Sequence, residues 1–229
     1  ATDATEFVAE NATAANDKLF ALTLADGNLK VNYTVGKANN ENFDAFFGSV
    51  LKKTVEAAVS QTVTLKRPFA QVNVGVNDKQ AVIDQFGENC FANATSYLSI
   101  EKYDVFNIKT GLVDENSKNK NTISTAPIPA GQFDVAGDKD KYDYMLMAYI
   151  LVPSEKQVIN YATIRVKEIE GIAGSTGKKI EVSNVPVQRN YRTNIIGSLF
   201  TTNANFNVVI DPIFENDSFD VTDAASFSK

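Results

Sequence analysis

The stretch VSNVPVQRNYRTNIIGSLF, residues 182–200, decides the fold. It is typical of one strand whose two halves have different roles. In each half, apolar or β-branched residues recur at every second position, which places them on one face of a strand. These residues are Val185, Val187, Tyr191, Thr193 and Ile195. Pro186 cannot donate a ladder hydrogen bond, so we expect the first half at an edge of a sheet or at its entry.

Similar strand patterns recur along the chain. The expected strand regions are 19–35 (a hairpin about Asp26-Gly27), 59–76, 95–100, 103–110, 143–153, 158–169, 179–185 and 206–210. A helix is expected at 49–59, where apolar residues approximate a helical stripe. A second is expected at 79–86, which Asn77-Asp78 would cap and Gly87 would end. About ten strands with so little helix predict an all-β sandwich or barrel.

Length and charge limit the possible partners. The 229 residues suffice for one large domain or two small ones with a well-buried core. The net charge of −6, with Lys and Arg scattered among the acids, argues against nucleic-acid and anionic-membrane partners. No run approaches the roughly 20 apolar residues of a membrane span. Residues 1–18 are polar and Ala-rich and contain no signal peptide. We expect them to be a flexible lead-in or a trimmed mature end, and we expect no transmembrane segment.

Histidine is absent from the sequence. This excludes His-based acid and base catalysis, the Ser-His-Asp arrangement and the commonest zinc ligand. The single cysteine, Cys90, cannot form an intramolecular disulfide, and we expect it to be a small buried hydrophobe. The remaining catalytic option is a pair of carboxylates. The available acids, which no local signature unites, are Asp104, Asp114, Glu115 and Asp143. We therefore predict no enzyme, no catalytic residue, no cofactor and no metal site.

Two loops contain residue types that bind ions. Asp138, Asp140 and Asp143 could offer oxygen ligands to calcium, but this loop lacks the glycine and the closing glutamate of an EF-hand and contains two lysines. The other loop contains Gly171, Gly174 and Gly177. It does not fit the phosphate-loop pattern, and a strand pattern follows it where a helix would be needed. We expect both to be solvated loops.

Arginines and aromatic residues are the remaining candidates for binding. Arg67, Arg189 and Arg192 could bind an anionic ligand, because a guanidinium fits a carboxylate or a phosphate. We favour the structural alternative, in which they bridge to acids or to strand-end carbonyls. The aromatic candidates are Phe43, Phe46, Phe47, Tyr142, Tyr144 and Tyr149. They could form a surface for stacking of sugars or belong to the core.

Three stretches resemble, in the same order, the fimbrillin-like surface proteins of Bacteroidetes. They are VTLKRPFAQVNVGV (63–76), YMLMAYILVP (144–153) and NVPVQRNYRTNIIGSLFTTNANFNVVIDPIF (184–214). The last contains a V-P-x-x-R-N-Y-R-T-N-I run before a strand ending in I-D-P. The resemblance covers roughly residues 41–214. It implies a Greek-key β-sandwich of the transthyretin-like type with one short helix.

The resemblance also implies a domain organisation and a location. Residues 1–40 would be a lead-in and the remnant of an N-terminal sandwich domain, 41–214 the C-terminal sandwich domain, and 215–229 a tail. Under this resemblance, the family's lipobox cysteine and most of that N-terminal domain would be missing from residues 1–40. Export by a lipoprotein route would place the protein at the cell surface, in the outer membrane or a fimbria.

The implied function is that of a pilus subunit or cell-adhesion protein that assembles by β-strand exchange. Its partners would be other pilin-type subunits, with a host or bacterial surface glycan or protein as a possible target. The donor strand would come from residues 1–18 or from the tail, unless the tail is simply a frayed terminus. The apolar anchors of the tail are Phe214, Phe219, Val221 and Phe227. The alternative is an exported carbohydrate-binding surface module without polymerisation, which would need a row of exposed Tyr or Phe residues.

Overall fold

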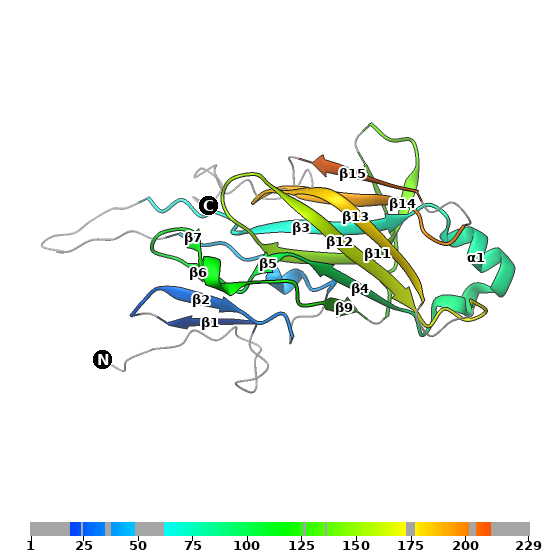
Figure 1. Ribbon diagram of the computed structural model, residues 1–229, viewed down its shortest axis with the longest axis horizontal. Helices are drawn as coiled ribbons and strands as arrows, with labels where there is room; N and C mark the ends of the chain where they lie inside the picture. Colours follow the sequence, from blue (N-terminus) through cyan, green and yellow to red (C-terminus); the bar gives the residue numbers. More distant parts are fainter. Residues whose placement is uncertain are drawn as a thin grey trace, which may run out of the picture.

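The computed structural model describes residues 19–23, 25–34, 38–48, 62–125, 127–135, 137–172, 177–201 and 205–211 (Figure 1). The strands are β1 (Phe20–Thr23), β2 (Asn28–Val31), β3 (Phe69–Val76), β4 (Thr95–Ile100), β5 (Lys102–Tyr103), β6 (Val105–Asn107), β7 (Leu112–Val113), β8 (Lys118–Asn119), β9 (Ile123–Thr125), β10 (Gln132–Asp134), β11 (Lys141–Leu151), β12 (Gln157–Lys167), β13 (Lys178–Val187), β14 (Arg192–Ser198) and β15 (Asn205–Asp211). The helices are α1 (Lys79–Phe86) and the 3-10 turns η2 (Glu41–Phe43), η3 (Glu88–Phe91) and η4 (Glu115–Ser117).

The largest sheet has the strand order β15-β14-β3-β11-β5-β8, and β10 adds to the end of β11. Its centre is β3, in which all eight residues are buried. β3 pairs antiparallel with β11 and parallel with β14. All other pairings among the described strands are antiparallel. The long apolar run in β11 is explained by the burial of this strand on both of its faces.

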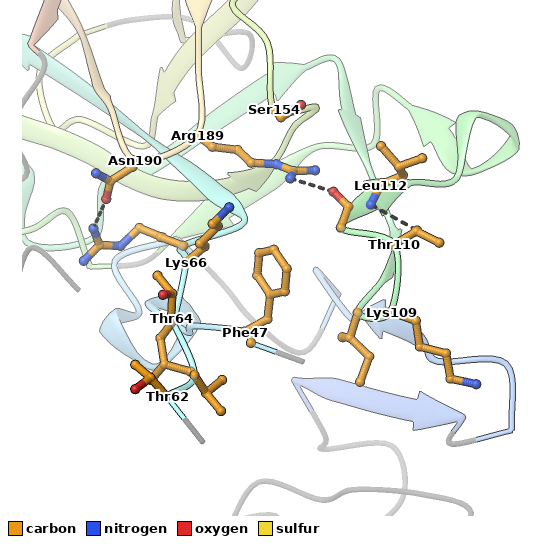
Figure 2. A pocket seen from close by; sticks show the side chains of 16 residues that line it. Phe47, Thr62, Thr64, Lys66, Lys109, Thr110, Leu112, Ser154, Arg189 and Asn190 are labelled. Carbon is orange, nitrogen blue, oxygen red and sulfur yellow. Dashed lines mark hydrogen bonds between the residues drawn. The ribbon is translucent and has the colours of Figure 1, made fainter. Parts of the chain in front are cut away.

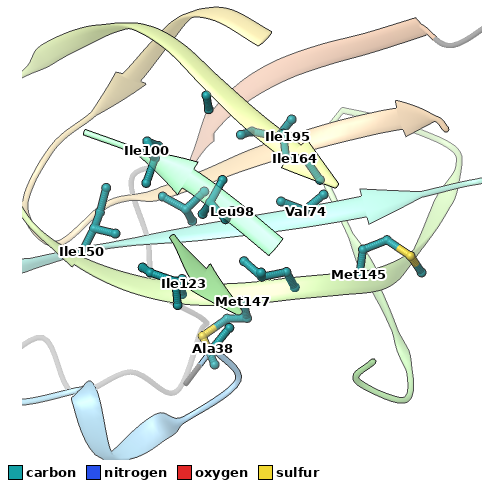
Figure 3. Packing of buried hydrophobic residues seen from close by; sticks show 14 of the residues in the cluster. Ala38, Val74, Leu98, Ile100, Ile123, Met145, Met147, Ile150, Ile164 and Ile195 are labelled. Atoms are coloured by element: carbon teal, nitrogen blue, oxygen red, sulfur yellow. The ribbon is translucent and has the colours of Figure 1, made fainter. Parts of the chain in front are cut away.

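A second sheet, of order β13-β12-β4-β9, covers one face of the first. Figure 1 shows β12 and β13 crossing over β3, β11 and β14. Leu98 and Ile164 of the second sheet pack with Val74 and Ile195 of the first, and all four are fully buried (Figure 3). Each such side chain contributes about 1.5–3 kcal/mol by leaving water. These two layers make the chain an all-β sandwich with one α-helix in its described part, as the sequence predicts.

A small third sheet, β1-β2-β6-β7, contains the predicted hairpin about Asp26-Gly27. Val31 and Phe106 of this sheet belong to the same buried cluster as the sandwich. Tyr33 follows β2, and its hydroxyl oxygen accepts a hydrogen bond from the backbone N–H of Leu151 at 2.8 Å. Residues before position 41 thus contact the main core, and the division of the chain into domains remains a prediction.

The prediction of one strand over 182–200 is wrong. β13 ends at Val187, a turn follows, and β14 begins at Arg192 in the other layer. Asn190 makes this turn possible, because it adopts a left-handed conformation with φ 61° and asparagine tolerates that region better than most residues. Its N–H donates to the carbonyl of Phe69. Pro186 lies on β13, an edge strand, as predicted.

The helix predicted at 79–86 is confirmed as α1, with Gly87 after its last residue. The predicted capping role of Asp78 is only partly correct. Asp78 precedes the helix, but its side chain makes no capping hydrogen bond. Its buried carboxylate instead accepts hydrogen bonds from the backbone N–H groups of Leu199, Phe200 and Thr201, at 3.1, 2.7 and 2.8 Å. The helix predicted at 49–59 lies outside the described residues.

We expect the substitution Asp78→Asn to lower the free energy of unfolding by about 1.5–3 kcal/mol, because hydrogen bonds to a buried charged acceptor are lost. Urea denaturation followed by circular dichroism measures this. Glu88→Gln, which removes one exposed acid from the neighbouring turn, is the matched control. Equal stability of the two variants would contradict the role assigned to Asp78.

Candidate functional site

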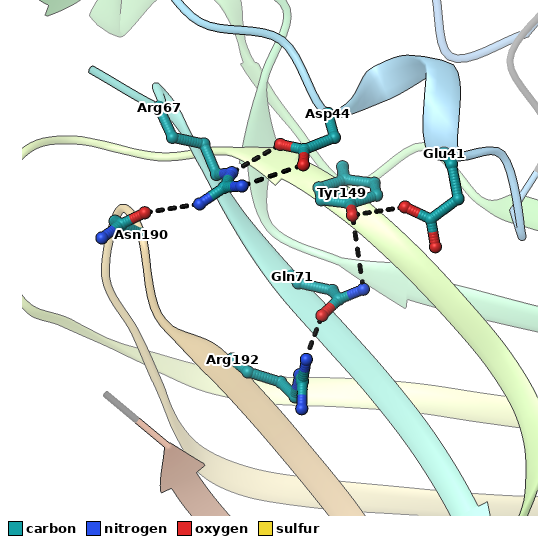
Figure 4. Close-up of polar contacts among 7 residues, drawn as sticks. All are labelled: Glu41, Asp44, Arg67, Gln71, Tyr149, Asn190 and Arg192. Atoms are coloured by element: carbon teal, nitrogen blue, oxygen red, sulfur yellow. Dashed lines mark hydrogen bonds and ion pairs between the residues drawn. The ribbon is translucent and has the colours of Figure 1, made fainter. Parts of the chain in front are cut away.

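Arg67 forms a bidentate ion pair with Asp44. Its Nε and Nη2 donate to the two carboxylate oxygens at 2.5 and 2.9 Å, and Nη1 donates to Oδ1 of Asn190 at 2.6 Å (Figure 4). The Arg67 side chain is buried, and its guanidinium carbon lies 4.6 Å from the ring centre of Phe46. Arg67 therefore joins the segment after η2 to the turn between β13 and β14. The expectation that Arg67 bridges to an acidic residue of the protein is correct.

Arg192 begins a chain of buried polar contacts across the first sheet (Figure 4). Its Nε donates to the side-chain oxygen of Gln71 at 2.9 Å, and Gln71 is its partner in the parallel β14–β3 register. The amide of Gln71 reaches the hydroxyl of Tyr149 at 3.5 Å, and that hydroxyl donates to Glu41 at 2.6 Å. Burial raises the pKa of Tyr149. These contacts fix strand register and need no ligand.

Arg189 lies in the turn and reaches towards the third sheet. Its Nε donates to the carbonyl of Val152 at 2.7 Å and its Nη1 to the carbonyl of Gly111 at 2.8 Å. The guanidinium lies 5.0 Å from the ring centre of Phe106. Burial lowers the pKa of Arg189 to about 10. Its Nη2 is buried and has no hydrogen-bond partner among the described residues.

The six aromatic candidates do not form an exposed row. Phe43, Tyr142 and Tyr149 are buried, so the core interpretation is correct for them. Phe46, Phe47 and Tyr144 are half-buried. The more exposed tyrosine is Tyr161 of β12, which is 40% exposed and has Lys120 over its ring. Sequence reasoning missed it because strand alternation alone does not say which face is covered.

The acidic candidates take part in local hydrogen bonds. Asp138 accepts from the hydroxyl of Tyr142 at 2.7 Å, which lowers the pKa of Asp138. Asp140 accepts from Asn77 at 3.3 Å. Asp114 and Glu115 accept from a backbone N–H and from the Tyr103 hydroxyl, respectively. Within the described residues, no three His, Cys, Asp or Glu side chains are grouped as a metal site would need.

The glycine-rich loop connects two strands, and the cysteine lies in the core. Gly171 and Gly177 have φ of 81° and 64° and flank the connection between β12 and β13, while Gly174 lies outside the described residues. Cys90 is buried in the core, and burial raises the pKa of its thiol. A thiol of raised pKa is a poor nucleophile.

The predicted donor segments lie outside the described residues. These are the lead-in, residues 1–18, and the tail anchors Phe214, Phe219, Val221 and Phe227. Their acceptor, however, can be sought in the described part of the chain.

Strands β13 and β15 form an open side of the sandwich. Each pairs with a single described neighbour, β12 and β14, respectively. A groove of about 550 Å³ runs between residues 180–184 of β13 and 206–208 of β15. Ile180, Phe206 and Val208 line the groove, are half-buried and pack against the main core. Among the described residues, two strand edges without a pairing partner thus border an apolar strip.

A larger cleft, of about 710 Å³, lies at another place. Its walls are residues 62–67, which lead into β3, and residues 108–112 between β6 and β7 (Figure 2). Phe47, Gly48, Ser154, Arg189 and Asn190 complete the described lining. No helix in the described part of the chain has the length and hydrophobicity needed to cross a membrane.

Comparison with known proteins identifies the family. Residues 6–227 match the model of a family of unknown function, DUF6562. The chain belongs to this family. No curated protein matches the DUF6562 chain.

Two solved structures are similar to parts of the DUF6562 chain. One is a putative cell adhesion protein from Bacteroides ovatus, with 13% identity over 69% of this chain and a TM-score of 0.39. The other is a fimbrial protein from Bacteroides vulgatus, with 8% identity over 65% of this chain and a TM-score of 0.29. The chain spans about half the length of each, 49% and 55%.

Lys102 is the most buried cation of the described residues. Its ammonium donates to the side-chain oxygen of Asn119 at 2.5 Å and to the carbonyl of Asn121 at 3.0 Å, and it lies 4.8 Å from the ring centre of Tyr33. Burial lowers the pKa of Lys102 to about 8, and nearby Asp104 offsets part of that effect. Its hydrogen bonds are internal, which indicates a structural role.

The lowered pKa of Lys102 predicts that the contribution of this residue to stability rises with pH. Between about pH 8 and 10 the unfolded chain keeps the Lys102 proton that the folded chain releases, so Lys102 adds to the free energy of unfolding over that range. Urea denaturation at several pH values measures the slope. Lys102→Met should remove this increase, whereas the exposed control Lys139→Met should keep it. Equal slopes in all three proteins would show that Lys102 does not titrate there.

Proposed function

We propose that the protein is a fimbrillin-like cell-surface protein, a pilus subunit or adhesion protein that joins its neighbours by addition of a β-strand. The observation that carries this proposal is the groove between the free edges of β13 and β15. The sequence resemblance in three ordered blocks points in the same direction. The function is binding and assembly, not catalysis.

The groove has the features that strand addition requires. A free strand edge offers a row of unpaired N–H and C=O groups to an incoming strand. Those backbone bonds supply affinity, and side chains at alternate positions of the guest fill pockets. Ile180, Phe206 and Val208 provide the apolar floor on which such side chains would rest. An incoming strand would complete the cover of the core at this side.

The C-terminal tail is the donor that the sequence favours. Phe219, Val221 and Phe227 are separated by even numbers of residues, so an extended chain presents them on one face. Phe214 falls on the other face. The tail follows β15 directly, so it could reach its own groove or that of a neighbouring molecule. We propose the neighbouring molecule, because this arrangement forms a polymer.

The proposal includes a location and a domain arrangement. The protein would be exported by a lipoprotein route and held at the cell surface, in the outer membrane or a fimbria. Residues 1–40 would be a lead-in and the remnant of an N-terminal sandwich domain, 41–214 the C-terminal sandwich domain and 215–229 the C-terminal tail. Its partners would be other pilin-type subunits.

Disulfide trapping tests the exchange. One full-length variant carries Ser183→Cys on the exposed wall of the groove, and a second carries Val221→Cys in the tail. Oxidation of the mixture should give a disulfide-linked dimer of the two variants, because the tail of one lies in the groove of the other. Cys90 can stay in place since it is buried. Non-reducing gel electrophoresis with mass spectrometry identifies the linkage.

A control position and a chain that carries both cysteines complete this test. Lys30→Cys places a thiol on the exposed face of β2, away from the groove, and should not link to Val221→Cys. Equal linkage of both positions would contradict the proposal. A chain with both Ser183→Cys and Val221→Cys that links only within itself would show that the tail fills its own groove, and exchange would then be wrong.

A further inference from the structure

The cleft between residues 62–67 and 108–112 has the size of a ligand site. Its volume of about 710 Å³ falls in the range of about 300–1,000 Å³ that is usual for small-molecule pockets. Its two walls come from distant parts of the chain, the approach to β3 and the turn between β6 and β7 (Figure 2). It shares no lining residue with the groove between β13 and β15.

The lining of the cleft is cationic. It includes Lys66, Arg67, Lys109 and Arg189, and no Asp or Glu is among its described lining residues. This local excess occurs in a chain that has 28 acids and 22 Lys and Arg residues. Asp44, which is not among the described lining residues, neutralises the charge of Arg67. Lys66 and Lys109 are exposed, and neither takes part in an ion pair within the described residues. The ammonium of Lys109 donates one hydrogen bond to the carbonyl of Ala25 at 2.6 Å, which leaves its charge without a counter-charge there.

Arg189 adds a buried donor to the wall. Two of its nitrogens are bound to the carbonyls of Val152 and Gly111, which hold the guanidinium in place. The third, Nη2, is buried without a partner among the described residues. A buried donor without an acceptor is unfavourable, and a ligand oxygen at this position would supply the acceptor.

The same walls also carry apolar and hydroxyl groups. Val63 and Leu112 are 45% and 59% exposed, although most large hydrophobic side chains of the described chain are buried. The ring of Phe47 lies between the two walls (Figure 2). Hydroxyls come from Thr64 and Thr110. The cleft therefore offers positive charge, hydrogen-bonding groups and apolar surface together.

We propose that this cleft binds an acidic saccharide. The C–H face of a sugar ring would pack on Phe47 and Leu112, its hydroxyls would bond to the threonines, and its carboxylate or sulfate would face Lys66 and Lys109. A free inorganic anion would leave the apolar surface uncovered, and a neutral sugar would offer no counter-charge to the two lysines. A long nucleic acid is disfavoured by the net charge of −6. The proposal goes beyond assembly, because it names a target for adhesion, and it does not depend on strand exchange.

Calorimetric titration of the full chain with matched oligosaccharides tests the proposal. The probes are galactotriose, trigalacturonate and a chondroitin sulfate tetrasaccharide, so that a neutral sugar, a sugar with carboxylates and a sugar with both carboxylates and sulfates are compared. We expect at least one acidic probe to bind about tenfold or more tightly than the neutral one at low ionic strength. Added salt should weaken this binding, because exposed lysines carry the charge. Absence of binding by both acidic probes, or equal affinity for galactotriose, would overturn the proposal.

Two exposed lysines allow the site to be located. The double variant Lys66→Gln and Lys109→Gln should lose affinity for the acidic probe by about tenfold or more, and its unchanged thermal unfolding would show that it folds. Lys139→Gln, an exposed residue outside the cleft, should bind as the parent does. Amide chemical-shift changes on titration should include Thr110 and Gly111. Binding that survives the double variant, or shifts confined to other strands, would place the ligand elsewhere and refute the assignment.

Discussion

The hydrogen-bonding of β3 to β11 on one side and to β14 on the other is the interaction on which the rest of the structure depends. All residues of β3 are buried, and its alternate positions carry two different kinds of side chain. Val72 and Val74 face the second sheet. Gln71 and Asn73 face the opposite side and bond to Arg192 and Asn194, their register partners on β14. A shift of register by one residue would place these amides in the apolar layer, so the polar pairs specify the alignment.

Much of the fold could be predicted from the sequence, because strand patterns are local. The long apolar run of β11, the alternation in β3 and the turn at Asp26-Gly27 all lie where the sequence indicates. Residues 182–200 were misjudged because period-two alternation continues through the turn, and only the left-handed Asn190 interrupts the strand. The role of Asp78 was hidden for another reason. Its hydrogen-bond partners follow β14, far along the chain, and no spacing rule connects them.

The candidate sites were less predictable than the fold. The sequence drew attention to Arg67 and Arg192, whose guanidinium groups are engaged within the protein. The sequence gave no reason to single out Lys66 or Lys109, because only the packing of two distant connections brings both residues into the lining of one cleft. The groove likewise results from sheet order. The strand order of each sheet places β13 and β15 at its edge, and no residue pattern within either strand indicates this position.

The parallel pairing of β3 with β14 also affects how the protein folds. Asn73 and Asn194, which bond to each other in the middle of the central sheet, are 121 residues apart in the chain. Closing so long a loop costs conformational entropy before any contact compensates for it, and folds dominated by such contacts form slowly. The central sheet cannot be completed until the chain beyond β14 is present. During synthesis this sheet is therefore completed only when almost all of the described chain is present.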